Sequence, residues 1–143
     1  MKLPVLNDFF AGIVTATSKE PLLTPPTCDL SDGFEIQALS VNQTAVMLSK
    51  INQTTATGPD ELPGFLLKKL SSAIAPNITK IINCSIKTGV FPRQWKEANV
   101  VAIWKKKGKK SEASNYRPIF ILPVLGRITE KACATQLHNY CEQ

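Results

Sequence analysis

The sequence predicts an α+β fold that is mostly helical and carries one short two-stranded element. Two observations point to it: apolar residues recur at helical spacing in several segments, and two β-branched runs flank a lysine-rich loop. The chain has 143 residues, of which 43% are hydrophobic and 20% are charged. These values are typical of a chain with a real core and argue against wholesale disorder. Because no apolar run approaches the about 18 residues of a membrane span, we expect no membrane partner.

Two helices are predicted in the first third of the chain, with a loop between them. The loop over residues 18–33 is rich in Pro, Asp and Gly. The second helix is expected to begin after Ser40, a residue type that caps helix N-termini. The first helix has apolar residues at steps of three and four: Leu3, Leu6, Phe9, Phe10, Ile13 and Val14. The second has Val41, Ala45, Leu48 and Ile51 on one face.

A turn and two further helices are predicted next. Thr57-Gly58-Pro59-Asp60 has the composition of a turn. A short helix over 62–70 follows, and then a longer one over 73–87, with Pro76 in its first turn and Gly89 closing it. The apolar stripe of the longer helix comprises Ile74, Ile78, Ile81, Ile82 and Ile86.

The last third of the chain predicts two strands and a helix. Residues 98–104 and 116–122 have strand composition, and the Lys/Gly/Ser stretch 105–115 between them is expected to be a loop. Pro123 opens the last helix. Its candidate packing positions are Leu125, Ile128, Ala132, Leu137 and Tyr140.

Positive charge is concentrated in the second half of the chain. Residues 1–67 carry 3 basic and 7 acidic side chains, whereas residues 68–143 carry 14 basic and 4 acidic ones. The predicted loop holds Lys105, Lys106, Lys107, Lys109 and Lys110 around Gly108. Such a loop is either a solvated surface or a contact for an anionic partner such as a nucleic acid. Trp104, just before it, is expected to be a core residue at the strand end rather than a base-stacking one.

Catalytic and metal chemistry find no support in the residue pattern. His138 is the only histidine, which nearly excludes a catalytic triad, and His138 with Cys141 supplies too few ligands for zinc. The nearest carboxylate pair, Asp60-Glu61, lies beside a turn and is not clustered with others as two-metal catalysis needs. We therefore expect neither catalytic nor metal-binding residues in this chain.

The N-terminus and the cysteines predict a location in the nucleus or cytoplasm, not secretion. Asn7 and Asp8 interrupt the first apolar run too early for a signal peptide. The four cysteines form no Cys-x-x-Cys motif, and reduced thiols are the expected state.

Three phrases in the chain stand out together. They are Ala56-Thr57-Gly58-Pro59-Asp60, Thr88-Gly89-Val90-Phe91-Pro92 and Ser114-Asn115-Tyr116-Arg117-Pro118-Ile119. In this order and at these spacings, they resemble the start of the reverse transcriptase domain of non-LTR retrotransposons of the LINE or jockey-like group. The resemblance covers nearly the whole chain and is strongest over 56–140.

The resemblance implies a fold and a division of the chain. Residues 56–143 would be a partial fingers region of a right-hand polymerase, and residues 1–55 a helical linker or N-terminal extension. Palm and thumb, with the catalytic aspartates that hold magnesium in the complete enzyme, would lie outside this chain. We therefore expect this chain alone to be inactive as a polymerase.

The resemblance also implies site residues. Arg117 would grip the triphosphate of an incoming nucleotide, helped by Lys105 or Lys106. RNA template and DNA primer would be the partners of the parent domain. Their expected contacts are Lys107, Lys109, Lys110, Gly58, Pro59, Asp60, Asn115 and Tyr116.

Two departures from the family pattern and two alternatives remain. Glu61 stands where the family usually has glycine, which strains the turn if that position needs a positive φ. Phe120 stands where the family usually has serine and is expected to disturb packing in the second strand.

One alternative is a non-enzymatic interaction remnant that self-associates through exposed apolar faces of the last helix, at Ile128, Leu137 and Tyr140. The other is a decayed copy with no selected function.

Overall fold

The computed structural model describes residues 3–17 and 33–142, and the chain divides into two compact units. The described part of the first unit comprises residues 3–17 and 100–120. The described part of the second unit comprises residues 33–99 and 121–142. The predicted loop over 18–33 lies, apart from its last residue, outside the described residues, as does Cys28.

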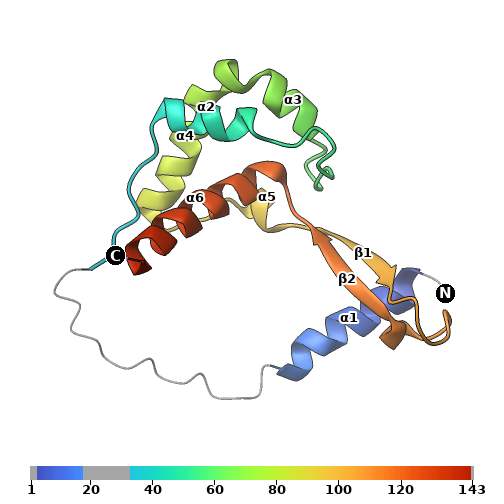
Figure 1. Cartoon of the computed structure of the whole chain (residues 1–143). Coiled ribbons are helices and arrows are strands. Elements are labelled where there is room, and N and C mark those ends of the chain that lie inside the picture. The colour runs from blue at the N-terminus through green and yellow to red at the C-terminus, as the bar shows by residue number, and fades with distance from the viewer. Residues whose placement is uncertain (1–2, 18–32, 143) are drawn as a thin grey trace. The chain divides into compact units, whose positions relative to one another are not determined.

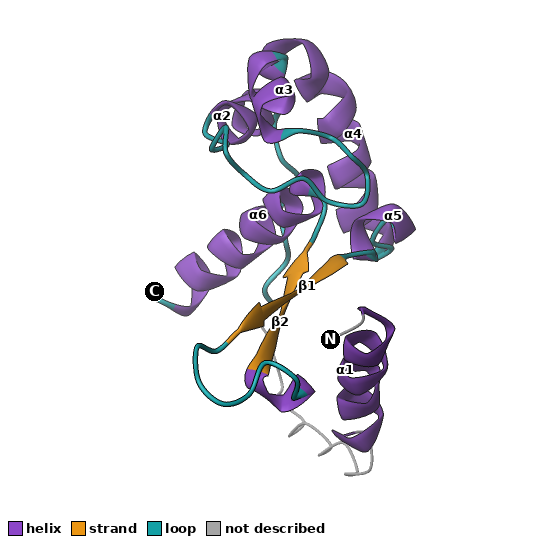
Figure 2. Ribbon diagram, turned by 90° about the vertical axis from the view of Figure 1, so that its right-hand side faces the viewer, coloured by secondary structure: helices purple, strands orange, loops and turns teal. Residues whose placement is uncertain are grey.

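The first unit contains a helix and a β-hairpin. Helix α1 spans Leu3–Thr17, strand β1 spans Asn99–Trp104, the short 3-10 helix η1 spans Ala113–Asn115, and strand β2 spans Tyr116–Ile121. The two strands form an antiparallel sheet of their own. Helix α1 contacts η1 beside the hairpin (Figure 2). Leu6 and Phe10, one turn apart on α1, are its buried side chains among those described.

The second unit is helical. It contains α2 (Val41–Ser49), α3 (Gly64–Lys69), α4 (Ser71–Thr88), α5 (Arg93–Lys96) and α6 (Val124–Cys141), labelled in Figure 1. The mostly helical composition with one two-stranded sheet confirms the predicted α+β class.

Helix α2 begins where the sequence predicts. The Gln43 backbone N–H donates to Ser40 Oγ at 3.2 Å, and the Ser40 N–H donates to Gln43 Oε1 at 2.8 Å. This reciprocal pair is a capping box, which satisfies donors that a helix start leaves without an intrahelical partner. It fixes the direction in which α2 leaves the extended segment before it.

The core of the second unit lies between α2 and α4. Leu48 and Ile82 are fully buried there. A polar contact at this depth is satisfied on both sides: Thr79 Oγ1 donates to Thr44 Oγ1 at 2.8 Å, and Thr44 Oγ1 bonds the Ser40 carbonyl oxygen at 3.2 Å. Burying a hydroxyl costs little free energy when it is hydrogen-bonded, so these threonines allow α2 and α4 to pack closely.

Helix α4 differs from its prediction at the start and agrees at the end. It begins at Ser71, so Pro76 lies in the second turn and not in the first. It ends at Gly89, whose φ of 67° is left-handed and is easily adopted by glycine. In its predicted apolar stripe Ile82 is fully buried. Ile81 is 44% exposed, so the assignment of Ile81 to the buried stripe was wrong.

Other predicted packing positions differ from the structure in their exposure. Val41 on α2 and Leu137 and Tyr140 on α6 are exposed, whereas Ile128 is buried in the core. Ile128 therefore cannot belong to an exposed apolar face, because the same position packs inside the unit.

Helix α5 was not predicted, because its four residues are too few to show a period. It buries Trp95, whose ring meets that of Phe91 edge-on with centroids 5.7 Å apart. At Gly126 an added β-carbon would lie 3.2 Å from Trp95 Cβ. The glycine therefore allows α6 to approach α5 closely.

Replacing Leu48 by alanine tests this core. We expect Leu48→Ala to lower the free energy of unfolding by about 2–5 kcal/mol, because it leaves a cavity between α2 and α4. Val46→Ala, on the exposed side of the same helix, is the matched control and should cost well under half as much. Urea denaturation followed by circular dichroism measures both, and equal losses would place the core elsewhere.

Candidate nucleic-acid interface

The lysine loop is the closed end of the β-hairpin. The Lys105 backbone N–H donates to the Asn115 carbonyl oxygen at 2.8 Å, so these residues pair directly across the two strands. The residues between them close the hairpin and include four of the five lysines that the sequence singles out, and Lys105 itself is the fifth. Residues 105–115 are called the lysine loop below.

The side chain of Asn115 fills this loop. Its Nδ2 donates to the Lys109 carbonyl oxygen and to Glu112 Oε2, both at 3.0 Å. Gly108, with φ 72°, passes so close that an added β-carbon would lie 2.6 Å from Asn115 Cγ. Glycine suits this position, since a side chain would be strained by the positive φ and would have to displace the Asn115 amide. The loop is thus folded around one amide.

Tyr116 and Trp104 support the loop from the hairpin. The Tyr116 hydroxyl donates to the Lys110 carbonyl oxygen at 3.0 Å. Lys110 Nζ lies 4.9 Å from the centroid of the Trp104 ring, a cation–π distance. Trp104 is half-buried at the strand end and is not part of the buried core, so the expected core position is met only in part. Lys110 covers its ring.

The five lysines differ in what their ammonium groups contact. Lys105 Nζ donates to the Ser114 carbonyl oxygen at 2.7 Å, and Lys110 lies over Trp104. Lys106, Lys107 and Lys109 are exposed. The ion pairs found among the described residues are Arg93–Glu97 and His138–Glu142. Neither pair involves these three lysines, so their positive charges are not neutralised by a carboxylate. The loop therefore presents a local positive charge to solvent.

Arg117 shares a strand face with Lys105. The Lys105–Asn115 pairing places Arg117 opposite Ile103, and strand alternation puts Lys105, Ile103 and Arg117 on one face. Arg117 and Ile103 are exposed, whereas Trp104 and Tyr116 on the other face are half-buried. Lys105 and Arg117 are therefore diagonal neighbours on the exposed face.

The predicted Gly58-Pro59-Asp60 contacts belong to the second unit and form a turn. The Glu61 backbone N–H donates to the Gly58 carbonyl oxygen at 3.1 Å. Gly58 is buried, and an added β-carbon would lie 2.6 Å from the backbone nitrogen of Pro123, at the start of α6. Gly58 is thus required by packing.

Glu61 adopts the positive φ that its position in this turn implies. Its φ of 54° is left-handed, which costs a non-glycine residue about 1–2 kcal/mol. The expectation of strain at this departure from the family pattern is confirmed. The expected disturbance at Phe120 is not seen, because the side chain is 58% exposed within a strand that continues to Ile121.

Two buried polar atoms beside this turn have no hydrogen-bond partner. They are Asp60 Oδ2 and Arg127 Nε. Arg127 also donates from Nη2 to the Ala56 carbonyl oxygen at 3.1 Å, which ties the segment before the turn to α6. Arg127 was not predicted from the sequence, although a charged residue in the first turn of an otherwise apolar helix start is a usable signal.

The described residues hold no cluster suited to a metal. Within 3–17 and 33–142, His, Cys, Asp and Glu form no group of three or more. His138 is exposed and pairs with Glu142 at 3.2 Å when protonated. Burial raises the pKa of the Cys133 thiol, which favours its protonated form.

None of the helices in the described ranges combines the length and the apolar composition that a bilayer crossing requires.

Comparison with known proteins places these residues in a family context. No family model matches the chain. The RNA-directed DNA polymerase from mobile element jockey of Drosophila melanogaster is 26% identical over 105 residues, which are 73% of this chain and 12% of that protein. The probable RNA-directed DNA polymerase from transposon X-element of the same species is 27% identical over 100 residues, 70% of this chain and 11% of that protein.

A third relative is the putative 115 kDa protein in type-1 retrotransposable element R1DM of Drosophila melanogaster. It is 32% identical over 94 residues, 65% of this chain and 9% of that protein. The chain is a sequence relative of the polymerases of non-LTR retrotransposons. The resemblance expected from the three sequence phrases is thereby confirmed. The chain spans about a tenth of the length of these relatives.

Replacing Asn115 by alanine tests whether its amide holds the loop. We expect backbone order parameters over residues 106–112 to fall from near the rigid value of about 0.85 to below about 0.6. The reason is that the Lys109 carbonyl and Glu112 lose their common partner. Ser111→Ala, at an exposed loop position, is the control and should leave them unchanged. An equally ordered loop in Asn115→Ala would contradict this role.

Proposed function

We propose that this chain is part of an RNA-directed DNA polymerase of a mobile element and that its role there is phosphate contact rather than the chemical step. Residues 56–143 would form a partial fingers region of a right-hand polymerase, and residues 1–55 a helical extension. The observation that carries the proposal is the exposed, uncompensated charge of Lys106, Lys107 and Lys109 on a loop of fixed shape. The names of the relatives support it.

Nucleic-acid backbone is the ligand that such a loop suits best. Each phosphate that a lysine neutralises releases condensed counterions, which favours binding at low salt. Because Asn115 holds the loop, its backbone is ordered before binding, which lowers the ordering cost of contact through its exposed lysines. RNA template and DNA primer are the proposed partners.

Nucleotide triphosphate is the proposed ligand of the neighbouring strand face. Arg117 offers a rigid fork that fits phosphate oxygens, and Lys105 on the same face adds a mobile point charge. Lys105 Nζ uses one of its three donors on the Ser114 carbonyl oxygen and keeps two. Face sharing favours Lys105 over Lys106 as the partner of Arg117, since Lys106 lies beyond the paired residues in a left-handed conformation.

Internal contacts favour a positioning role for several other proposed contact residues. Asn115 and Tyr116 direct their polar atoms to the loop backbone, and Gly58 is buried against Pro123. Lys110 covers Trp104. For Pro59 and Asp60, direct contact with a nucleic acid remains a proposal carried by the resemblance alone.

Polymerase catalysis is not proposed for this chain by itself. Magnesium in the complete family enzyme would require aspartates that the sequence resemblance places elsewhere, and no described residues form a suitable cluster. An alternative function is a non-enzymatic interaction remnant. The exposure of Leu137 (48%) and Tyr140 (43%) on α6 favours it, although Ile128 does not contribute.

Neutralising the exposed lysines tests nucleic-acid contact. We expect the triple variant Lys106→Ala, Lys107→Ala, Lys109→Ala to bind single-stranded RNA at least tenfold more weakly at low salt. Its slope of log affinity against log salt should shrink by about 0.7 for each phosphate that the variant no longer neutralises. Fluorescence anisotropy with a labelled RNA at several salt concentrations measures both quantities.

The matched control removes the same charge from the second unit. The variant Lys69→Ala, Lys80→Ala, Lys87→Ala changes three exposed lysines on or near α4. It should weaken RNA binding less than threefold. Equal losses in the two triple variants would show that only net charge matters and would refute a loop-centred site.

Arg117 is tested with a deoxynucleoside triphosphate. We expect Arg117→Ala to weaken binding about tenfold, because a charge-assisted hydrogen bond contributes roughly 1.5–3 kcal/mol. Arg117→Lys should retain part of the affinity, since it keeps the charge and loses the fork. Isothermal titration calorimetry measures the series, with Arg93→Ala, a side chain 90% exposed, as the control. No difference between Arg117→Ala and Arg93→Ala would exclude Arg117 from the site.

A further inference from the structure

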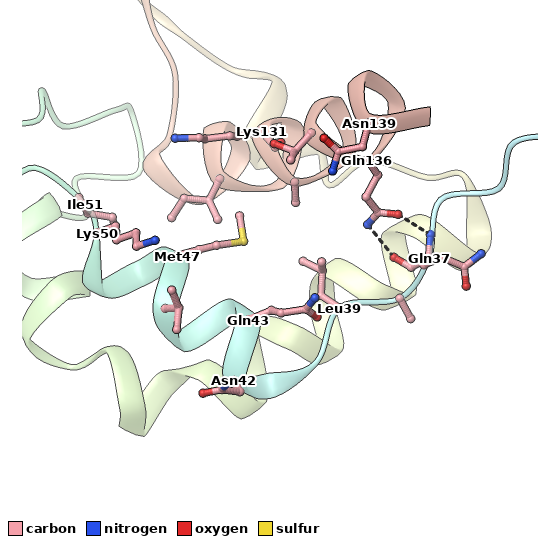
Figure 3. Close-up of a pocket in the computed structure, with 15 residues that line it drawn as sticks. Gln37, Leu39, Asn42, Gln43, Met47, Lys50, Ile51, Lys131, Gln136 and Asn139 are labelled. Atoms are coloured by element: carbon pink, nitrogen blue, oxygen red, sulfur yellow. Dashed lines mark hydrogen bonds between the residues drawn. The ribbon is translucent and has the colours of Figure 1, made fainter. Parts of the chain in front are cut away.

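A groove of about 770 Å³ lies in the second unit between α2 and α6 (Figure 3). Its apolar lining includes Leu39, Met47, Ile51, Ile128 and Ala132. The volume falls within the usual range for ligand sites, about 300–1,000 Å³. The groove contains none of the lysine-loop residues, so it is a separate feature that the proposed function does not use.

The extended segment that borders the groove is held in place by two side-chain amides. Gln136 Oε1 accepts from the Gln37 backbone N–H at 2.8 Å, and Gln136 Nε2 donates to the Gln37 carbonyl oxygen at 3.0 Å. Asn83 makes the same pair of bonds with Leu39, both at 2.8 Å. The segment is therefore ordered before any ligand arrives, which lowers the cost of binding.

Both long walls of the groove are helix faces. The lining positions of α6 recur at steps of three and four from Ile128 to Asn139, and those of α2 extend from Asn42 to Met47, followed by Lys50. At about 1.5 Å per residue, the α6 wall is about three helical turns long. Two helix faces that line one apolar groove match the surface that receives the apolar face of a third helix.

Charge on the groove is of one sign. Lys50 and Lys131 extend from the opposite walls at the same end of the groove (Figure 3). No carboxylate lines it, and neither lysine takes part in an ion pair among the described residues. Gln136 and Asn139 lie at the other end. The complementary ligand is apolar along its length and carries negative charge on both flanks at one end.

We propose that this groove docks one acidic amphipathic helix, about three turns long, from a partner protein. Apolar side chains at helical spacing would fill the space over Leu39, Met47 and Ala132. Carboxylates on the two flanks of the docked helix would pair with Lys50 and Lys131. A fatty-acid-like anion brings one negative charge to two lysines, whereas a helix with two carboxylates matches their charge.

The test uses the full chain and a synthetic 15-residue helical peptide as the probe. The peptide has leucines along one face and glutamates on both flanks of one end, and a second peptide has lysines in place of the glutamates. Fluorescence anisotropy should show the glutamate peptide binding at least tenfold more tightly than the lysine peptide. The double variant Lys50→Glu, Lys131→Glu should reverse this preference.

A blocking variant separates the groove from the rest of the surface. Thr135→Trp fills an exposed position of the lining and should reduce glutamate-peptide binding at least tenfold. Ala134→Trp, at the adjacent exposed position outside the lining, should leave it unchanged. Circular dichroism confirms that both variants are folded, and RNA affinity, which depends on the lysine loop, should be equal in both.

Three outcomes would overturn the proposal. Equal affinity of the two peptides for the unaltered chain would show that Lys50 and Lys131 do not favour an acidic helix. Peptide binding that survives Thr135→Trp would place the contact elsewhere. Binding of dodecanoate that Thr135→Trp abolishes, without peptide binding, would assign the groove to a small amphiphile instead. These results leave the proposed polymerase role untouched, because that role is tested by RNA binding and not by peptide binding.

Discussion

The shape of the lysine loop depends on the amide of Asn115. One side chain bonds the Lys109 carbonyl and Glu112, and it occupies the space that a β-carbon at Gly108 would need. The carbonyl of the same residue closes the hairpin by accepting from Lys105. Without this constraint, a loop of like charges would repel itself and spread over many conformations. With it, the backbone that carries the exposed lysines keeps one shape at the end of the hairpin.

Close backbone contact also shapes the second unit, where glycine permits it at two places. Gly58 lies against Pro123, and Gly126 lies against Trp95, so a turn and a short helix both rest on the first residues of α6. Glu61 accepts a left-handed φ within this arrangement. The strain is local, and the packed segments around it offset it. The helical unit thereby forms a scaffold whose groove between α2 and α6 remains open.

Much of the fold follows from local signals in the sequence. Ser40, Gly89 and Pro123 mark helix boundaries because their chemistry is read from neighbouring residues alone, and the β-branched runs predict both strands. Burial was harder to predict, since Ile81 and Val41 have helical spacing and yet are exposed. At the site, composition identified the lysines. It could not show that Lys105 and Lys110 are occupied by Ser114 and Trp104, because those contacts exist only in the folded hairpin.

We propose that nucleic acid contacts this chain at the hairpin and not through diffuse positive charge. The most direct measurement is a titration of the isotope-labelled chain with a short single-stranded RNA, followed by backbone amide chemical shifts. Contact at the hairpin predicts that the largest shift changes fall within residues 105–117, with small changes along α4 despite its lysines. Changes spread over all basic segments, or centred on α3 and α4, would contradict it.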